Sequence, residues 1–204
     1  MGRPVFDNAG FLAAARVLAC ERGPSAVTVD SVTQQLKAPK GSFYHRFASR
    51  DALLGELWLK TVLAYQEGFV AAIEAGDGLA AALHTPRWAR QHLDDARLLL
   101  LYSRHDFVQG DWPAALKRGV REQALRIEGC LASFARAAFG RAGPANLQRA
   151  AFVLAGVPLA AVKPHLERRE PPPALADELI AATYHAIVEA GMRASIGEGA
   201  STPR

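Results

Sequence analysis

The 204-residue chain contains only two cysteines, Cys20 and Cys130, and no long uninterrupted hydrophobic run. Two thiols so far apart make no disulfide framework, and each lies in an Ala/Leu-rich stretch, so we expect both to be buried and reduced. The N-terminus lacks the apolar run of a signal peptide, and no apolar run approaches the roughly 20 residues of a membrane span. We therefore expect a soluble, cytoplasmic protein with no membrane partner.

The sequence also lacks the motifs of the common enzyme classes. It contains no nucleophile motif, no P-loop and no dinucleotide-binding fingerprint. The histidines considered as metal ligands are scattered and none belongs to a close ligand pair; they are His84, His92, His105, His165 and His185. We therefore predict a protein that is not an enzyme, with no catalytic residues, no metal site and no cofactor.

Strand-forming residues occur only in short clusters, without the alternation that is typical of a β-strand. Half of the chain is hydrophobic, and long stretches rich in Ala, Leu, Arg and Glu repeat with helical spacing, which favours an all-α fold. The net charge of +4 is a mild bias that indicates no partner by itself. Its distribution is more informative, because residues 37–50 contain lysine, arginine and histidine but no acid.

Three short helices are predicted at the N-terminus. The first spans residues 8–22, and Asp7 is its N-cap. The second begins after the capping residue Thr28 and ends before Pro39, because a residue that precedes proline avoids the helical conformation. The third runs from residue 40 to about residue 46. The last two helices, with a break of three or four residues between them, form a helix-turn-helix.

A helix-turn-helix places the N-terminal residues of its second helix in the major groove of DNA. We expect Lys40, Tyr44 and Arg50 to bind mainly phosphate, whereas Ser42 and His45 are suited to reading base edges. The predicted DNA-binding residues are Thr28, Lys37, Lys40, Gly41, Ser42, Tyr44, His45, Arg46 and Arg50. Basic charge alone leaves open the alternative of a solvated basic turn in a generic helical bundle.

The segment KGSFYHRFASRDALL, preceded by FLAAARVLACERG and TVDSV, resembles the N-terminal DNA-binding domain of TetR/AcrR-type transcriptional regulators. The resemblance covers roughly residues 6–57. Within it, Phe43 and Phe47 are one helical turn apart and should face inward to hold the third helix. The positions that match the family pattern are Lys40, Gly41, Ser42, Phe43, Tyr44, Phe47, Ser49, Arg50, Asp51 and Leu53. The resemblance implies a DNA-binding head on a helical, ligand-sensing and dimerising body.

The chain departs from the family at the turn, where Leu36-Lys37-Ala38-Pro39 replaces the usual Ala-Gly-Val-Ser. Lys37 stands in place of the glycine, so either this residue adopts a positive φ or the turn has another shape. Pro39 removes the serine hydroxyl that normally caps the third helix. We therefore transfer no operator sequence from the family to this chain.

The rest of the chain is predicted to form a helical body. A long helix should begin after the capping residue Ser49 and run to residue 74. A helix is expected at 79–84, broken near Pro86, and residues 87–92 and 95–104 should form either one helix with a break or two consecutive helices. The further expected segments are a loop at 105–110, a helix from the cap Asp111 to 139, a linker at 140–144, a helix at 145–166 kinked or ended early by Pro158, and a last helix at 175–193.

We divide the chain into a helix-turn-helix domain at residues 1–48, an effector-binding and dimerisation domain at 49–196, and a disordered tail at 197–204. By analogy with the family's pocket, the predicted effector-binding residues are Trp58, Tyr65, Phe69, Trp88, His92, Tyr102, His105 and Phe107. Core packing is the alternative for each aromatic residue. By the same analogy, the predicted homodimer interface comprises Val153, Val157, Ala160, Ala161, Leu179, Thr183, Ala186, Ile187 and Ala190.

The function predicted from these features is sequence-specific DNA binding by a transcriptional regulator. A homodimer would bind a palindromic operator in double-stranded DNA, because two heads on a two-fold axis read two half-sites. We expect a repressor that is released when an unknown small-molecule effector binds the C-terminal domain. The alternative is a helical small-molecule-binding protein with altered or lost DNA binding.

Overall fold

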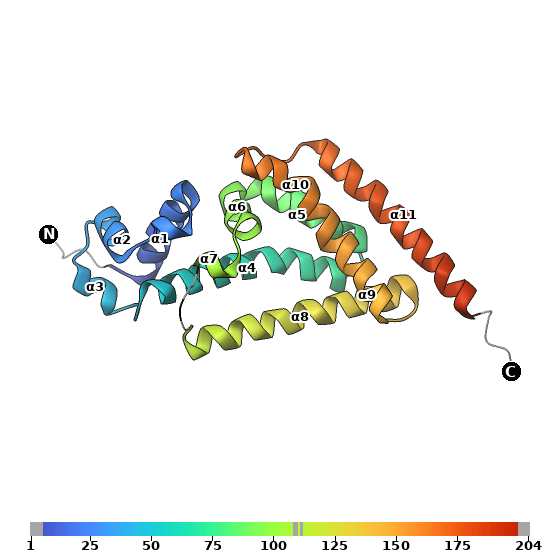
Figure 1. Ribbon diagram of the computed structural model, residues 1–204, viewed down its shortest axis with the longest axis horizontal. Coiled ribbons are helices and arrows are strands. Elements are labelled where there is room, and N and C mark those ends of the chain that lie inside the picture. Colours follow the sequence, from blue (N-terminus) through green and yellow to red (C-terminus); the bar gives the residue numbers. More distant parts are fainter. Residues whose placement is uncertain (1–5, 108–109, 111, 200–204) are drawn as a thin grey trace. The chain divides into compact units, whose positions relative to one another are not determined.

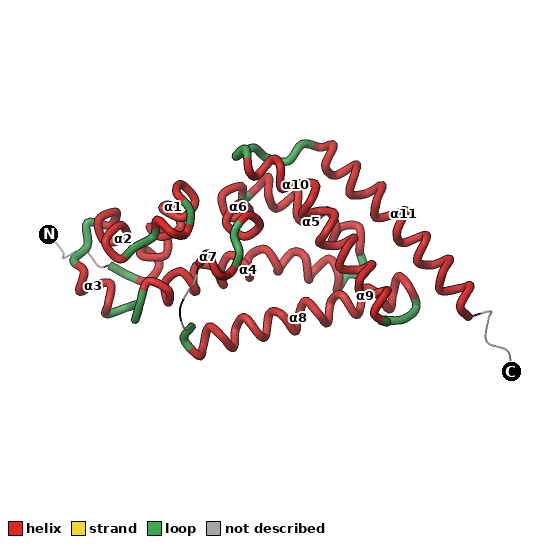
Figure 2. The backbone as a smooth tube through the Cα atoms, viewed as in Figure 1, coloured by secondary structure: helices red, strands yellow, loops and turns green. Residues whose placement is uncertain are grey.

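The computed structural model describes residues 6–107, 110 and 112–199, and all regular structure in this part of the chain is helical (Figures 1 and 2). The all-α prediction is confirmed, with a helix-turn-helix followed by a larger helical part. In chain order the elements are α1 (Asn8–Arg22), the 3-10 turn η1 (Pro24–Ala26), α2 (Val29–Leu36), α3 (Lys40–Tyr44), α4 (Arg50–Glu74), α5 (Gly78–Gln91), α6 (Leu93–Leu101), α7 (Arg104–Phe107), α8 (Ala114–Phe139), α9 (Pro144–Ala151), the π-helical segment η2 (Phe152–Gly156), α10 (Val157–Glu167) and α11 (Ala174–Gly199).

Capping side chains define where the N-terminal helices begin. Asp7, Thr28 and Ser49 each accept a hydrogen bond from the backbone N–H three residues later, at 2.8, 3.0 and 3.1 Å. Each bond satisfies a backbone donor that the first helical turn leaves without a partner. The predicted starts of α1, α2 and α4 are therefore confirmed, and α1 ends as expected at Gly23, which has a φ of 84°.

Helix α5 runs without interruption through Pro86, so the predicted break is wrong. A proline in a helix interior removes one backbone hydrogen bond and costs about 3 kcal/mol. Here the neighbouring turns bury apolar side chains, among them Ala82, Trp88 and Ala89. Removal of this apolar surface from water offsets the cost of the proline.

The predicted loop at 105–110 is wrong over its first residues, because α7 occupies them. The N–H and the hydroxyl of Ser103 donate to the Asp106 carboxylate at 2.6 and 2.8 Å, and these bonds lower the pKa of Asp106. Phe107, at the end of the helical turn, is buried. The predicted cap Asp111 lies outside the described residues, and α8 begins at Ala114.

The helix predicted at 145–166 is present as α9, η2 and α10. Helical structure continues past Pro158, and the irregular part is the π-helical segment just before it. By length and composition, Pro144–Glu167 would suffice to cross a membrane, with a mean hydropathy of 1.3. However, α10 packs against α5 and α11, and a single helix of this kind is weak evidence for a membrane span.

Helix α11 is longer than predicted, because it extends to Gly199 instead of ending near residue 193. The predicted disordered tail at 197–204 is therefore wrong for residues 197–199, which continue the helix. The remaining five residues of that prediction, 200–204, lie outside the described residues.

Packing divides the chain into two compact units. The first comprises Met1–Leu63 with Asp94–Arg121, and the second comprises Ala64–Leu93 with Glu122–Arg204. Helices α4 and α8 each contribute to both units. The first unit joins α6 to α1 through an ion pair of 2.6 Å between Arg16 and Asp95. The predicted functional boundary between residues 48 and 49 is a different division and stays a prediction.

Each unit has its own hydrophobic core. The core of the first unit includes Phe11, Leu18, Val32, Phe43, Phe47, Leu53, Leu98 and Phe107. The core of the second unit includes Phe69, Val70, Phe134, Phe139, Val153, Leu154 and Ile180. Cys20 and Cys130 are buried free thiols, as predicted, and burial raises the pKa of Cys20 to about 11.

Candidate nucleic-acid interface

Three aromatic rings fix the orientation of α3 in the first unit. Phe11 of α1 contacts Phe43 and Phe47 edge to face, with ring centroids 5.7 and 6.1 Å apart. The rings of Phe43 and Phe47 lie 5.8 Å from each other, and all three residues are almost fully buried. The prediction that Phe43 and Phe47 face inward is confirmed. The opposite side of α3 is thereby held toward solvent.

The turn between α2 and α3 is built around Lys37, which has the left-handed conformation with φ 53° and ψ 37°. Its N–H donates to the carbonyl of Gln34 at 3.1 Å, and the N–H of Ala38 donates to Thr33 at 2.8 Å. These two bonds form a Schellman C-cap, which glycine usually supports. Of the two possibilities left by the sequence, the positive φ is the one observed. A residue other than glycine in this conformation costs about 1–3 kcal/mol.

The start of α3 presents an exposed edge of polar and basic side chains. Pro39 is the N-cap and contributes no side-chain hydrogen bond, while the hydroxyl of Ser42 donates to the Pro39 carbonyl at 2.6 Å. A Cβ added at Gly41 would meet none of the described atoms within 4 Å, so a ligand has room to approach. Tyr44 is 59% exposed. We call this surface the reading edge; it comprises Lys40, Gly41, Ser42, Tyr44 and His45.

Lys40, at the first position of α3, forms an ion pair with Asp30 in the first turn of α2. Its Nζ lies 2.6 Å from Asp30 Oδ1, and the two side chains are 65% and 71% exposed. The hydrogen bond to Asp30 raises the pKa of Lys40, so its ammonium group remains charged at neutral pH. Asp30 was not among the residues predicted from the sequence to influence the interface.

Three further predicted DNA-binding residues lie around the reading edge. Thr28 is exposed and uses its hydroxyl to cap α2, while the guanidinium of Arg46 donates to Asn8 at 3.3 Å. Lys37 is exposed in the turn. These side chains therefore lie on one short segment, from the start of α2 to the end of α3.

Arg50 has a bracing role that the sequence did not predict. Its guanidinium donates to the carbonyls of Val27 and Pro24 at 2.6 and 2.8 Å and to the Asp51 carboxylate at 2.9 Å. Asp51 in turn accepts the N–H of Gly110 at 2.9 Å. Arg50 therefore holds the chain before α2 against the start of α4. A direct contact between Arg50 and phosphate stays a prediction.

Comparison with known proteins identifies the domain that carries this edge. Residues 11–57 match the family model of the bacterial regulatory proteins of the tetR family. This domain belongs to the TetR family. The resemblance seen in the sequence is thereby confirmed, and DNA-binding transcriptional regulation is the function that the TetR-family fold supports.

The fold of the whole chain is similar to a solved structure from Mesorhizobium loti MAFF303099, a protein assigned to the TetR family of transcriptional regulators. The TM-score is 0.57 at 15% sequence identity, and the match covers 92% of this chain and 95% of the other. At this identity the likeness concerns the fold alone. No match was found among curated proteins.

Outside the TetR-family domain, three predicted effector-binding residues come together in the second unit. The ring of Trp88 lies 5.2 Å from that of Tyr65 and 5.4 Å from that of His92. The hydroxyl of Tyr65 is hydrogen-bonded to Thr85 at 2.8 Å, and its carbonyl to His84 Nε2 at 2.7 Å. We call these five residues the Tyr65 cluster. Burial raises the pKa of Tyr65 and lowers that of His84.

The other predicted effector-binding residues are placed elsewhere. Phe69 and Phe107 belong to the two hydrophobic cores, which is the alternative that the sequence left open. In the first unit, Trp58 packs edge to face on Trp112 at 5.8 Å. The remaining two are Tyr102, whose hydroxyl lies beside Gly23, and the exposed His105. His84 and Thr85 were missed, because only their contact with Tyr65, about 20 residues earlier, distinguishes them.

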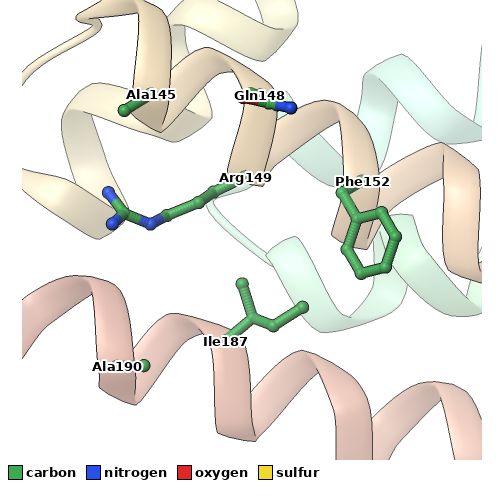
Figure 3. Close-up of a pocket in the computed structure, with 6 residues that line it drawn as sticks. All are labelled: Ala145, Gln148, Arg149, Phe152, Ile187 and Ala190. Carbon is green, nitrogen blue, oxygen red and sulfur yellow. The ribbon is translucent and has the colours of Figure 1, made fainter.

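Within the second unit, a hollow of about 350 Å³ opens between α9 and α11 (Figure 3). Figure 3 shows Arg149 extending along the hollow on one side and the ring of Phe152 on the other, with Ile187 of α11 across from them. The lining residues are Ala145, Gln148, Arg149, Phe152, Ile187 and Ala190. The sequence predicted a role for only Ile187 and Ala190, as dimer contacts.

The predicted dimer residues differ in how much surface they expose. Val153 is fully buried in the core of the second unit, so its assignment to the interface is wrong. Val153 belongs to the row of apolar residues that faces the core, not to one that faces a partner. Leu179, Ala160, Ala186 and Ala190 are exposed, whereas the half-buried members are Val157, Ala161, Thr183 and Ile187. The sequence missed four exposed apolar side chains of η2, α10 and α11, namely Phe152, Leu159, Leu175 and Met192.

Proposed function

We propose that this protein is a homodimeric transcriptional repressor that dissociates from a palindromic operator when a small-molecule effector binds. The observation that carries the proposal is the TetR-family match at residues 11–57, which includes the exposed reading edge. Lys40 and Tyr44 would bind phosphate, while Ser42 and His45 would contact base edges in the major groove. Such a regulator acts on DNA in the cytoplasm.

A homodimer is supported by the exposed apolar surface of η2, α10 and α11. Phe152, Leu175 and Leu179 are each more than half exposed. These three elements pack against one another, and exposed apolar side chains that gather on one surface are typical of protein interfaces. A single short reading edge contacts few base pairs, and a two-fold dimer would present two edges to two half-sites. We therefore place the dimer interface on this surface.

For the effector, the Tyr65 cluster is the site that the contacts support best. Its three rings are in edge-to-face and tilted contact. Together with a hydroxyl and an imidazole, they suit an apolar ligand that carries a few polar groups. A ligand changes the equilibrium between two states only by its difference in affinity for them. The effector would therefore bind more tightly to the conformation in which the two heads are wrongly spaced for DNA.

The alternative, a small-molecule-binding protein without DNA binding, is favoured by one observation. Lys37 and Pro39 replace the residues that normally shape the turn and cap α3. An electrophoretic mobility shift with DNA from upstream of the protein's own gene separates the two functions. A shift that is reversed by a ligand co-purified with the protein and identified by native mass spectrometry supports repression. Ligand binding without any shift supports the alternative.

A further inference from the structure

We propose that Asp30 weakens DNA binding by holding the ammonium group of Lys40 in the free protein. DNA must then displace a carboxylate before a phosphate can bind Lys40. Asp30 is the only acidic residue between Thr28 and Arg50, a segment that carries four lysines and arginines. The inference rests on the proposed DNA-binding function and concerns a residue that lies outside the predicted DNA-binding set.

The ion pair between Asp30 and Lys40 joins the two helices of the helix-turn-helix. Asp30 lies in the first turn of α2 and Lys40 is the first residue of α3, so the ion pair spans the turn. The side chains of Thr28 and Ser31 fix the start of α2 by capping each other's backbone N–H groups. The cap holds the backbone of Asp30 in place, and the carboxylate contacts the lysine that opens the reading edge.

The exposure of the pair makes it exchangeable. Both side chains are mostly exposed, and an exposed ion pair contributes at most about 1 kcal/mol to stability. A DNA phosphate is therefore able to replace Asp30 as the partner of Lys40. The exchange leaves the Asp30 carboxylate near a phosphate of the same charge. Both effects reduce affinity, and they act on every DNA sequence because phosphate contacts do not depend on sequence.

The test is Asp30→Asn, which removes the charge and keeps the shape of the side chain. Binding to a fluorescein-labelled duplex of mixed sequence is measured by anisotropy over a series of salt concentrations. We expect about 5-fold tighter binding at low salt. We also expect the slope of log affinity against log salt to steepen by about 0.9, because a carboxylate beside the phosphate no longer offsets the charge of Lys40. An unchanged melting temperature will confirm that the variant is folded.

Two controls separate the pair from a general charge effect. Glu67→Gln makes the same change in net charge at an exposed position of the second unit, and its affinity should match that of the wild type. In a Lys40→Gln background, Asp30→Asn should lose most of its effect. The inference is overturned if Asp30→Asn binds DNA no more tightly than the wild type does. It is also overturned if Asp30→Asn increases the affinity as much in the Lys40→Gln background as in the wild-type background. If the wild type fails to bind the duplex at low salt, the proposed function fails as well.

Discussion

The two ends of the chain expose opposite kinds of side chain. Around α3, the aromatic rings of Phe43 and Phe47 are buried and the reading edge is polar and basic. Around α11, Leu175 and Leu179 are exposed although they are apolar. A basic edge suits a polyanion, and an apolar face suits another protein surface. On this difference in exposed chemistry we base the proposal of a DNA-binding surface around α3 and a dimer interface around α11.

The largest effect is expected for the double substitution Lys40→Ala and Tyr44→Ala. It removes a charge and an aromatic hydroxyl from the reading edge and leaves the buried rings in place. Operator binding should be abolished, with affinity lower by more than about 100-fold, because each of the two reading edges of the proposed dimer loses two phosphate contacts. A mobility-shift titration measures the loss, and size-exclusion chromatography with light scattering should show an intact dimer.

A matched control for this loss is Lys163→Ala together with His165→Ala, which also removes one lysine and one ring but lies on α10. Its DNA affinity should equal that of the wild type. Undiminished operator binding by the Lys40/Tyr44 variant would show that the reading edge is misassigned.

A charge on the apolar face should break the dimer. Leu179→Glu places a carboxylate where we propose that a second copy packs, and desolvation of an unpaired charge is strongly unfavourable. The variant should be monomeric in light scattering and should bind a two-half-site operator about 10-fold or more weakly. The control is Leu125→Glu on α8, because Leu125 is 58% exposed and Leu179 is 55% exposed. Dimeric Leu179→Glu protein would place the interface elsewhere.

Smaller effects are expected for Lys37→Gly, which should raise stability and lower DNA affinity. Glycine adopts the left-handed conformation without strain, so the free energy of unfolding should rise by about 1 kcal/mol. DNA affinity should fall a few-fold, because a charge next to the reading edge is lost. Lys37→Asn serves as the control, since asparagine removes the charge and tolerates this conformation less well than glycine. Urea unfolding that shows Lys37→Gly to be less stable than the wild type would contradict the strain argument.

The smallest effect concerns pH and the Tyr65 cluster. Burial lowers the pKa of His84 below its ordinary value of 6.5, so the folded protein binds this proton less readily than the unfolded chain. The resulting stabilisation is complete above pH 6.5 and is lost as the pH falls through the lower pKa of the folded state. Urea unfolding at about pH 7.5 and about pH 5.5 measures how much the free energy of unfolding falls between the two pH values. This decrease should be smaller for His84→Gln than for the wild type. The exposed His105→Gln should behave as the wild type does.

The head was predictable from the sequence because its signals are local. Asp7, Thr28 and Ser49 cap N–H groups only three residues away, and the spacing of Phe43 and Phe47 identifies the buried side of α3. The charge pairing of Lys40 with Asp30 was not predictable in the same way. It depends on how the turn folds α3 back toward the start of α2.

The helical part that follows the helix-turn-helix was less predictable, because contacts between residues far apart in the sequence determine its structure. Helix α5 continues through Pro86 since it packs against α10 and α11. Its Arg90 donates to Asp177 at 2.9 Å and to the carbonyls of Pro172 and Pro173. No local sequence pattern predicts such contacts. For the same reason Val153 was mistaken for an interface residue, because helical spacing alone does not tell a core-facing stripe from a partner-facing one.

The most direct test of the central claim is selection of bound sequences from random duplex DNA by the full-length protein, followed by sequencing. A homodimer with two reading edges should enrich an inverted repeat of two equal half-sites, and the Lys40→Ala, Tyr44→Ala variant should enrich nothing. Enrichment of a single unrepeated site, or no enrichment by the wild type, would contradict the account of a dimeric TetR-family regulator.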